Sequence, residues 1–359
     1  MAGDRLNSIG DELRALLPVS ADAYLQKIDL VRGLGLVIRL DAGIYRSASF
    51  LDDRILGPST QGSWLSGIHM TEAARQIASP RPVHFIFHTG HVGSTLLSRL
   101  LDETGVVLSL REPLPLRSIA DAHDLLGLPE SLLSEAQFSA LLDMTLCLWS
   151  RGYDWTRAVA VKATSSAGRV ATPLLNARPR SLAIYLNLPA EPYLATLLSG
   201  QNSPEDLRGH GPGRIRRLQA RCRAPLAPLH AMSLGELAAL GWLAETMSQQ
   251  DARRRFPDRV LAVDFEELLS SLRDGMARIL GFLGLPTDAR YLAGLEANPV
   301  LKRYSKAPEL PFTPAARKAL LDDTRRDQCG EIDKGLAWLE RLARADDTVA
   351  SVMATTATP

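Results

Sequence analysis

The residues with the clearest chemical potential lie where a strand-like run gives way to a helix-like one. The apolar run Val83–Phe87 is followed by two glycines, Gly90 and Gly93, and a segment with helical periodicity begins at Ser94 and Thr95. Glycine permits positive φ and lets a ligand approach the backbone closely. The unpaired N–H groups and the dipole of a helix start favour a phosphate or sulfate. The spacing therefore predicts an anion-binding strand–loop–helix, with an ordinary Ser/Thr-capped helix start as the structural alternative.

The loop differs from the nucleotide-binding loop of ATPases and ordinary kinases. That motif places four residues between its glycines and then a lysine followed by Ser or Thr. Here only His91 and Val92 separate Gly90 from Gly93, and no lysine follows. The sequence therefore disfavours an ATPase or an ordinary kinase.

Further segments follow this loop in an informative order. The run His91–Leu97 is similar to the 5′-phosphosulfate loop of sulfotransferases, and the chain resembles bacterial sulfotransferase-like P-loop proteins over residues 81–286. The segments that carry the resemblance downstream are Leu110–Pro113, Lys162–Ser165, Ala183–Pro189, Arg259–Leu269 and Phe282–Pro286.

The resemblance implies a reaction and a base for it. Sulfotransferases move a sulfuryl group from 3′-phosphoadenosine 5′-phosphosulfate, the donor substrate, to an acceptor hydroxyl or amine without a metal. A base must take the proton of the acceptor. Glu112, directly after the second strand, is the residue that the resemblance assigns to this task. The structural alternative is a helix-start carboxylate beside Pro113.

The negative charge that develops on the leaving phosphate needs hydrogen-bond donors or cations. The family's loop usually supplies Lys or Arg, whereas this sequence has His91, which is either protonated between phosphates or a neutral donor. Lys162 ends the following strand at the same edge of the sheet, and we expect it to compensate. Its structural alternative is a strand end that faces solvent.

The 3′-phosphate site departs from the family pattern, in which an arginine precedes a proline by two residues. Asn187 occupies that place, with Thr196 and Ser199 close by, and these three are the expected ligands. Replacement cations are available in the basic segment Arg208–Arg223 or in Lys302–Lys306, although each also fits a solvated face. The expected donor-binding residues in the loop are Gly90, His91, Val92, Gly93, Ser94, Thr95 and Leu96.

The elements that must position these residues are short apolar runs that alternate with helical patterns. This alternation is typical of a parallel sheet covered by helices on both faces. We therefore predict an α/β fold with a P-loop NTPase-like parallel sheet flanked by helices, of the sulfotransferase-like kind. The five predicted strands are Val83–Phe87, Val106–Leu110, Ala158–Val161, Leu182–Leu186 and Val260–Val263.

Three parts are predicted along the chain. Residues 1–80 form a helix and a small β-rich extension packed on the main domain, with a hairpin between residues 36–40 and 44–47. Residues 81–345 form the α/β domain. Residues 200–225, rich in Gly, Pro and Arg, indicate a long basic loop. Residues 346–359 have few large apolar side chains and are expected to be a disordered tail.

Composition excludes several other classes. The 359 residues carry a net charge of only +1, which favours neither nucleic-acid nor membrane partners. Three scattered cysteines and no apolar run of membrane-spanning length indicate a soluble cytoplasmic protein. No metal is expected, because His84 and His88 would stand roughly 13 Å apart along a strand.

The partner expected is a small-molecule or carrier-bound acceptor, and the oligomeric state stays open, a homodimer included. Two alternative functions also remain at this point. One is a kinase-like phosphotransferase on the same P-loop scaffold, which would use magnesium and ATP. The other is a non-catalytic nucleotide-binding or partner-binding protein, because His91 and Asn187 replace the expected cations.

Overall fold

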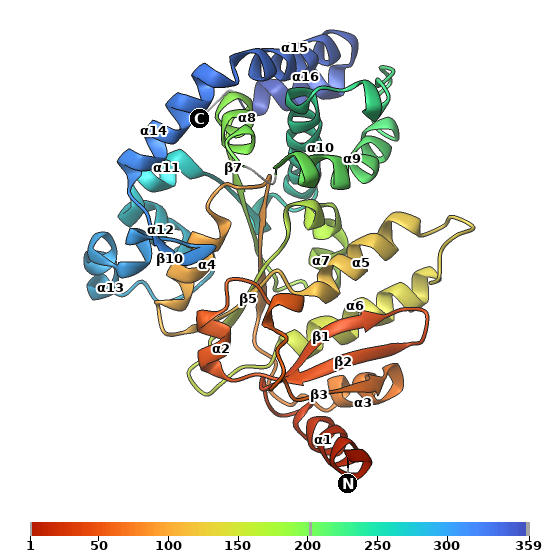
Figure 1. Cartoon of the computed structure of the whole chain (residues 1–359). Helices are drawn as coiled ribbons and strands as arrows, with labels where there is room; N and C mark the ends of the chain where they lie inside the picture. The colour runs from red at the N-terminus through yellow and green to blue at the C-terminus, as the bar shows by residue number, and fades with distance from the viewer. Residues whose placement is uncertain (1, 201–202, 357–359) are drawn as a thin grey trace.

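A five-stranded parallel sheet forms the centre of the molecule in the computed structural model (Figure 1). The model describes residues 2–200 and 203–356, with side chains described for residues 9–200, 203–307, 309 and 311–354. The strand order is β5-β6-β4-β7-β8, and all four pairings are parallel. The α/β prediction is confirmed, since the strands are β4 (Val83–His88), β5 (Val107–Arg111), β6 (Ala158–Lys162), β7 (Ala183–Asn187) and β8 (Val260–Asp264).

Helices cover both faces of this sheet, as the near-continuous apolar strands require. Side chains alternate along β4, so that Ile86 contacts one core while Phe85 and Phe87 contact the other. The Ile86 face is covered by α4 (Ser94–Asp102), α8 (Ala190–Leu198), α10 (Leu234–Arg255) and α12 (Leu272–Phe282). The Phe85 face is covered by α5 (Leu114–Leu125), α6 (Glu135–Trp149) and α7 (Ala171–Ala177).

The path of the chain creates a crevice between β4 and β6. After β4 the chain crosses one face through α4 to reach the edge strand β5. After β6 it crosses the opposite face through the short 3₁₀ helix η2 (Ser165–Val170) and α7 to reach β7. Two neighbouring strands whose connections leave toward opposite faces open a crevice at their carboxyl ends, where ligands bind in such folds.

An N-terminal extension packs against this body through a three-stranded antiparallel sheet, in the order β1-β2-β3. Met70 of α3 and Met144 of α6 lie in the same buried cluster. Two buried arginines fix the junction. Arg111 Nη1 donates to the Tyr45 carbonyl oxygen at 2.7 Å, and Arg151 Nη1 donates to the Leu17 carbonyl oxygen at 2.8 Å. The elements are α1 (Ala2–Leu16), β1 (Ala23–Asp29), β2 (Leu34–Arg39), α2 (Ala42–Ser47), β3 (Gly62–Ser66) and α3 (Gly67–Arg75).

The prediction of a hairpin between residues 36–40 and 44–47 was wrong. The strand β2 pairs with β1, upstream of it, and with β3, whereas residues 44–47 belong to the helix α2. The Asp41 carboxylate accepts a hydrogen bond from the backbone N–H of Ile44 and caps that helix. Capping by an Asp side chain therefore decides the local structure here.

Two segments expected to be irregular are helical. The residues 203–219 of the basic segment form α9 (Ser203–Gln219), because Leu207, Arg214 and Leu218 lie on one buried stripe against α10. Residues 201–202 lie outside the described residues. The expected disordered tail is also wrong over residues 347–356, which form α16 (Asp347–Thr356) with Val352 buried. Residues 357–359 lie outside the described part.

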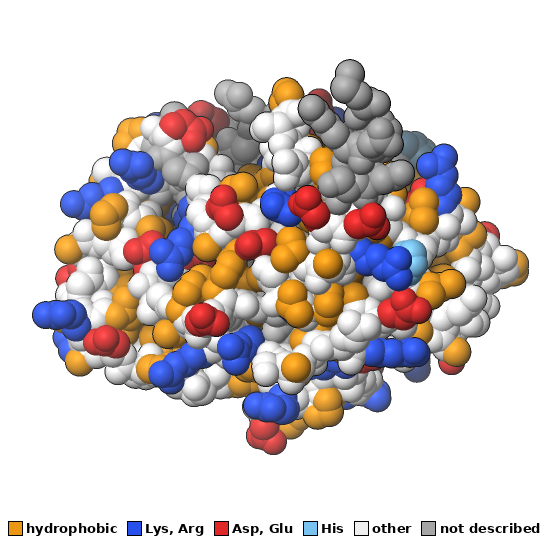
Figure 2. Space-filling view, turned by 90° about the horizontal axis from the view of Figure 1, so that it is seen from below, with side chains coloured by type: hydrophobic (Ala, Val, Ile, Leu, Met, Phe, Trp, Pro, Cys, Tyr) orange, Lys and Arg blue, Asp and Glu red, His pale blue; other side chains and the backbone are white. Residues whose placement is uncertain are grey.

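Of the remaining elements, which follow β8, α14 and α15 lie at the end of the molecule opposite the N-terminal sheet, whereas β10 and α13 lie beside α4 and α12 (Figure 1). No helix in the described residues is long and apolar enough to cross a membrane. On the face drawn in Figure 2, basic and acidic side chains are interspersed. These remaining elements are α11 (Phe265–Ser270), α13 (Ala289–Gly294), β9 (Arg303–Tyr304), β10 (Ala307–Pro311), α14 (Pro314–Asp327) and α15 (Cys329–Ala345).

Candidate active site

The loop between β4 and α4 leaves the start of that helix open. Gly93 is the N-cap residue, with φ at +71°, and no side chain caps the helix. Ser94 and Thr95 therefore lie inside the first turn and do not cap it, which favours the anion-binding interpretation over the ordinary cap. Both are buried, and the Thr95 hydroxyl has no hydrogen-bond partner. An unpartnered buried hydroxyl beside free backbone N–H groups is suited to a bound anion.

Gly93 is required here for two separable reasons. Its positive φ disfavours any L side chain, and a Cβ would stand 1.9 Å from the Phe265 ring. We expect Gly93→Ala to lower the free energy of unfolding by roughly 2 kcal/mol or more. The matched control is Gly105→Ala, because Gly105 has the same φ region, at +72°, and no atom within 4 Å. The free energies of unfolding of both variants are measured in urea, and their difference gives the effect of the Phe265 contact. Equal losses of stability would show that Phe265 does not require glycine at this position.

The end of β5 brings a carboxylate to the same edge of the sheet. Glu112 follows the strand directly, and its backbone N–H donates to the Lys162 carbonyl oxygen at 2.6 Å. Its carboxylate forms an ion pair with the ammonium of Lys162, which is fully buried. His91 and Glu112 are the two described residues other than glycine with positive φ. Such backbone strain, which costs of order 1–3 kcal/mol per residue, clusters at functional sites.

The ion pair sets the charge state of the carboxylate. Burial acts to raise the pKa of Glu112, but Lys162, Lys306 and Arg54 outweigh burial and lower it below its usual value. Burial lowers the pKa of Lys162 to about 8, against the opposing effect of Glu112. Glu112 is therefore ionised at neutral pH, which is the state that a general base needs. The alternative of a strand end that faces solvent is wrong for Lys162, because its side chain is fully buried and its ammonium is paired with Glu112.

Two histidines complete this edge. The Nε2 of His88 lies 2.9 Å from the Ala163 carbonyl oxygen, which can only accept, so Nε2 carries the proton. The Nδ1 of His88 is then an acceptor, and it has no partner. His91 is exposed, yet the surrounding protein and the charge of Lys306 lower its pKa to about 4. In the ligand-free protein His91 is therefore the neutral donor of the two states considered above.

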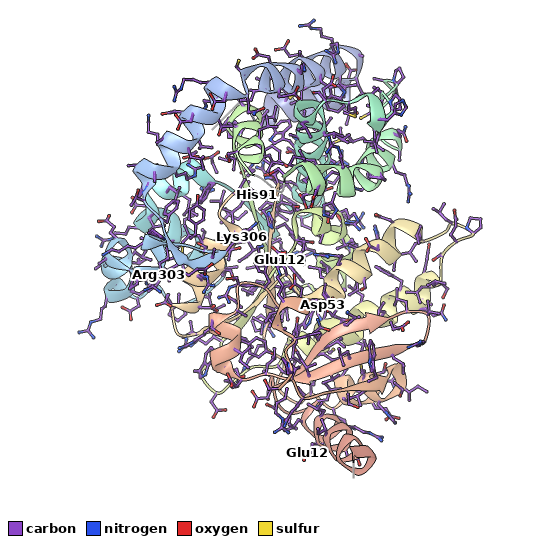
Figure 3. The ribbon with its side chains drawn as sticks, viewed as in Figure 1. Glu12, Asp53, His91, Glu112, Arg303 and Lys306 are labelled. Atoms are coloured by element: carbon purple, nitrogen blue, oxygen red, sulfur yellow. The ribbon has the colours of Figure 1, made fainter. Side chains whose placement is uncertain are left out.

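Two adjoining pockets meet at the loop. We call the first the central pocket; its walls include Gly90, His91, Glu112, Ser165 and Lys306. The second, the apolar pocket, has a volume of about 310 Å³ and lies between α4, α8 and the β9–β10 hairpin. Its walls include Val92, Gly93, Ser94, Thr95, Leu96, Thr196, Ser199, Phe265, Arg303, Tyr304, Phe312 and Arg317. Figure 3 shows His91, Lys306 and Glu112 near one another in the middle of the molecule, where they line the central pocket.

The structure thus brings together most of the predicted residues. One or both pockets are lined by the predicted loop residues and by Glu112, Thr196 and Ser199. Lys162 forms an ion pair with Glu112. Asn187 lines neither pocket; its side-chain amide is 3.5 Å from Gln249 Oε1. The described residues contain no group of three or more His, Cys, Asp or Glu side chains that could hold a metal ion.

Neither the family models nor the curated proteins include a match to this sequence. Solved structures that resemble it include several sulfotransferases. The sulfotransferase domain from the curacin biosynthetic pathway is 15% identical, with a TM-score of 0.39, and the match covers 74% of this chain and 98% of that one. The sulfotransferase STF9 from Mycobacterium avium is 13% identical, with a TM-score of 0.39 and 91% and 96% of the two chains covered.

A third match is mouse sulfotransferase SULT7A1 complexed with PAP, at 11% identity and a TM-score of 0.33, covering 76% of this chain and 93% of that one. All three likenesses are distant.

Sequence reasoning missed the position of a cation that lies beside the loop. Lys306 lines both pockets and, with Ser305, faces α4 from a hairpin more than 200 residues further along the chain. The basic run Lys302–Lys306 drew attention to this segment, but only as a substitute at the 3′-phosphate. Arg317 was also missed, since nothing in the sequence marks it. It stacks on Phe265, with 5.3 Å between the guanidinium carbon and the ring centroid.

Proposed function

We propose that the protein is a sulfotransferase that moves a sulfuryl group from 3′-phosphoadenosine 5′-phosphosulfate to an acceptor hydroxyl or amine. The observation that carries this proposal is the uncapped start of α4, with the unpartnered Thr95 hydroxyl in the apolar pocket, beside a central pocket that holds an ionised Glu112. An anion site and a base at one switch point of a parallel sheet are the parts that group transfer from an anionic donor needs.

The donor fits the two pockets in one orientation. Its phosphosulfate would lie on the backbone N–H groups at the start of α4, with the hydroxyls of Ser94 and Thr95. Its nucleoside would fill the apolar pocket, where Phe265 and Phe312 offer ring surfaces and Arg303 and Arg317 offer cations. The volume of about 310 Å³ is at the lower end of the range typical of small-molecule sites.

The chemistry then follows from the charges in the central pocket. Glu112 takes the proton as the acceptor oxygen or nitrogen forms its bond to sulfur. The bond between sulfur and the bridging phosphate oxygen breaks, and adenosine 3′,5′-bisphosphate leaves. The negative charge that develops on the phosphate is stabilised by the loop N–H groups, by His91 as a neutral donor, and by Lys306. Lys162 keeps Glu112 ionised and oriented, and therefore acts as a positioning residue.

A thermal-shift panel tests the proposal. A ligand at 100 times its dissociation constant adds about 2.7 kcal/mol of stability, which for a chain of this length is a rise in Tm of roughly 3–4 °C. We expect adenosine 3′,5′-bisphosphate to give this rise without added metal. A rise with magnesium–ATP alone would indicate the kinase-like alternative. No response to either ligand at millimolar concentration would favour a non-catalytic protein.

Lys306 provides the matched comparison within this panel. We expect Lys306→Met to weaken adenosine 3′,5′-bisphosphate binding by about tenfold, because a charge-assisted contact to phosphate is removed. Lys302→Met is the control, since Lys302 is exposed and lines neither pocket. Equal affinities of the two variants for adenosine 3′,5′-bisphosphate would show that Lys306 does not contact the donor.

A further inference from the structure

A third pocket adjoins the central pocket on the side away from the loop. It lies between α5, η2 and α9, with a volume of about 350 Å³, and we call it the arginine pocket. Arg117, His210 and Arg214 line both pockets, so the two share a boundary. A molecule with one end at Glu112 can therefore extend into the arginine pocket. Its charged walls are formed by Arg117, Arg169, Arg214, Arg216 and Arg217, with Asp121 and Asp124.

The positive charge of these walls exceeds the negative charge that the protein supplies. Asp121 and Asp124 both pair with Arg169, at 2.6 and 2.9 Å. Arg214 and Arg217 share a single buried carboxylate, that of Glu245, at 3.5 and 2.7 Å. Among the described residues, the exposed Arg117 and Arg216 have no ion-pair partner. Five guanidinium groups thus face three carboxylates.

Two of these guanidinium groups are also short of hydrogen bonds. Arg214 is 2% exposed, and neither its Nε nor its Nη1 has a hydrogen-bond partner. The Nε and Nη1 atoms of Arg217 are also buried without a hydrogen-bond partner. A buried charge whose donors are unsatisfied is costly, and a bound anion would complete the hydrogen bonds of both guanidinium groups. An arginine fork matches the oxygens of a carboxylate or phosphate.

Side chains of α5 and α9 lie close enough for their charges to affect one another. Burial lowers the pKa of His210, and the charges of Arg214 and Arg117 lower it further, while Asp206 opposes them. His210 also lies 3.4 Å from Asp206, which faces the central pocket. The central pocket therefore holds charges of both signs, from Glu112, Asp206 and Lys306, whereas the arginine pocket has an excess of positive charge.

We propose that the acceptor is an anionic small molecule that carries a phosphate or carboxylate group in addition to its hydroxyl or amine. The oxyanion group binds in the arginine pocket, with Arg117 and Arg216 at its mouth and Arg214 at its floor. The hydroxyl or amine then lies beside Glu112, because the arginine pocket carries the excess positive charge and shares a boundary with the central pocket. The assignment of this anion to the acceptor rests on the proposed sulfuryl transfer, whereas the anion site itself does not.

The test uses a pair of probes that differ by one phosphate group. Glycerol 3-phosphate and glycerol are titrated calorimetrically into the full chain at millimolar concentrations, with adenosine 3′,5′-bisphosphate present to occupy the loop. We expect glycerol 3-phosphate to bind and glycerol not to bind. Arg117→Gln and Arg216→Gln should each lower the affinity for glycerol 3-phosphate by about tenfold or more, which is the loss expected for one charge-assisted contact.

Arg208→Gln is the matched control, since Arg208 is an exposed arginine of α9 that lines none of the three pockets. It should leave the affinity unchanged. Absence of glycerol 3-phosphate binding would overturn the proposal. So would binding that Thr95→Ala abolishes and Arg117→Gln spares, because the anion would then occupy the loop. If adenosine 3′,5′-bisphosphate does not bind but the arginine variants still weaken the probe, the anion site stands and the sulfotransferase function fails.

Discussion

Glu112→Gln is expected to lower the rate of sulfuryl transfer by about 10²–10⁴-fold, the usual contribution of a general base. Glutamine has nearly the same shape but cannot accept a proton at the pH of the assay. The affinity for adenosine 3′,5′-bisphosphate should change little, because the donor lies on the loop and in the apolar pocket. The measurement is a steady-state assay with an identified acceptor, together with calorimetric binding of the bisphosphate.

The matched control is Glu103→Gln, an exposed glutamate at the other end of α4 that should retain full activity. Glu112→Gln also leaves the buried ammonium of Lys162 without its partner, so both proteins are compared well below the Tm of the variant. Full transfer activity in Glu112→Gln would show that another group takes the proton. The unpartnered Nδ1 of His88 would then be the nearest candidate on the central pocket.

The sheet and the loop were predictable because local sequence determines them. A strand buried on both faces must be apolar along its whole length, so runs such as Val83–Phe87 identify parallel strands directly. The loop needs glycine at Gly93, where φ is positive and Phe265 leaves no room for a side chain. The position of Glu112 beside the loop follows from the parallel topology alone, since strand ends share one edge.

The basic segment was mispredicted because glycine and proline dominate its composition. Local propensity disfavours a helix around Pro212, yet α9 continues through it. Burial of Leu207 and Leu218 against α10 supplies stabilisation that a local reading cannot include. Tertiary packing of one stripe thus overrides the weak helical propensity.

The remaining parts of the site depend on contacts between distant segments. Lys306 reaches the loop only because the β9–β10 hairpin folds back against α4, where the Arg99 guanidinium donates to the Ser305 carbonyl oxygen at 2.9 Å. The excess charge around Arg214 is visible only once α9 packs on α10 and Glu245 is seen to serve two arginines. A sequence shows that arginines are present, but it does not show how many carboxylates neutralise them.

Lys162→Met is expected to lower the free energy of unfolding at neutral pH by about 3–5 kcal/mol, since it leaves an unpaired carboxylate that is largely buried. Lys27→Met is the surface control. It removes an exposed ion pair with Asp53, whose side chain is 61% exposed, and should cost less than about 1 kcal/mol. Urea unfolding of the two variants gives both values. A similar small loss in both would show that the buried pair contributes little.

The pH dependence of the same variant separates the charge of Lys162 from its packing. In the native protein the pKa of Glu112 is lowered, so its contribution to stability is present above the unfolded-state pKa and is lost as pH falls through the folded-state pKa. Without Lys162, only Lys306 and Arg54 oppose the effect of burial, so the pKa of Glu112 rises relative to the native protein. Below both folded-state pKa values the carboxyl is protonated in the two proteins, so the difference in stability between them should shrink as the pH is lowered. For the same reason the acidic limb of the rate profile should move to higher pH, and an unmoved limb would exclude Lys162 from holding the base ionised.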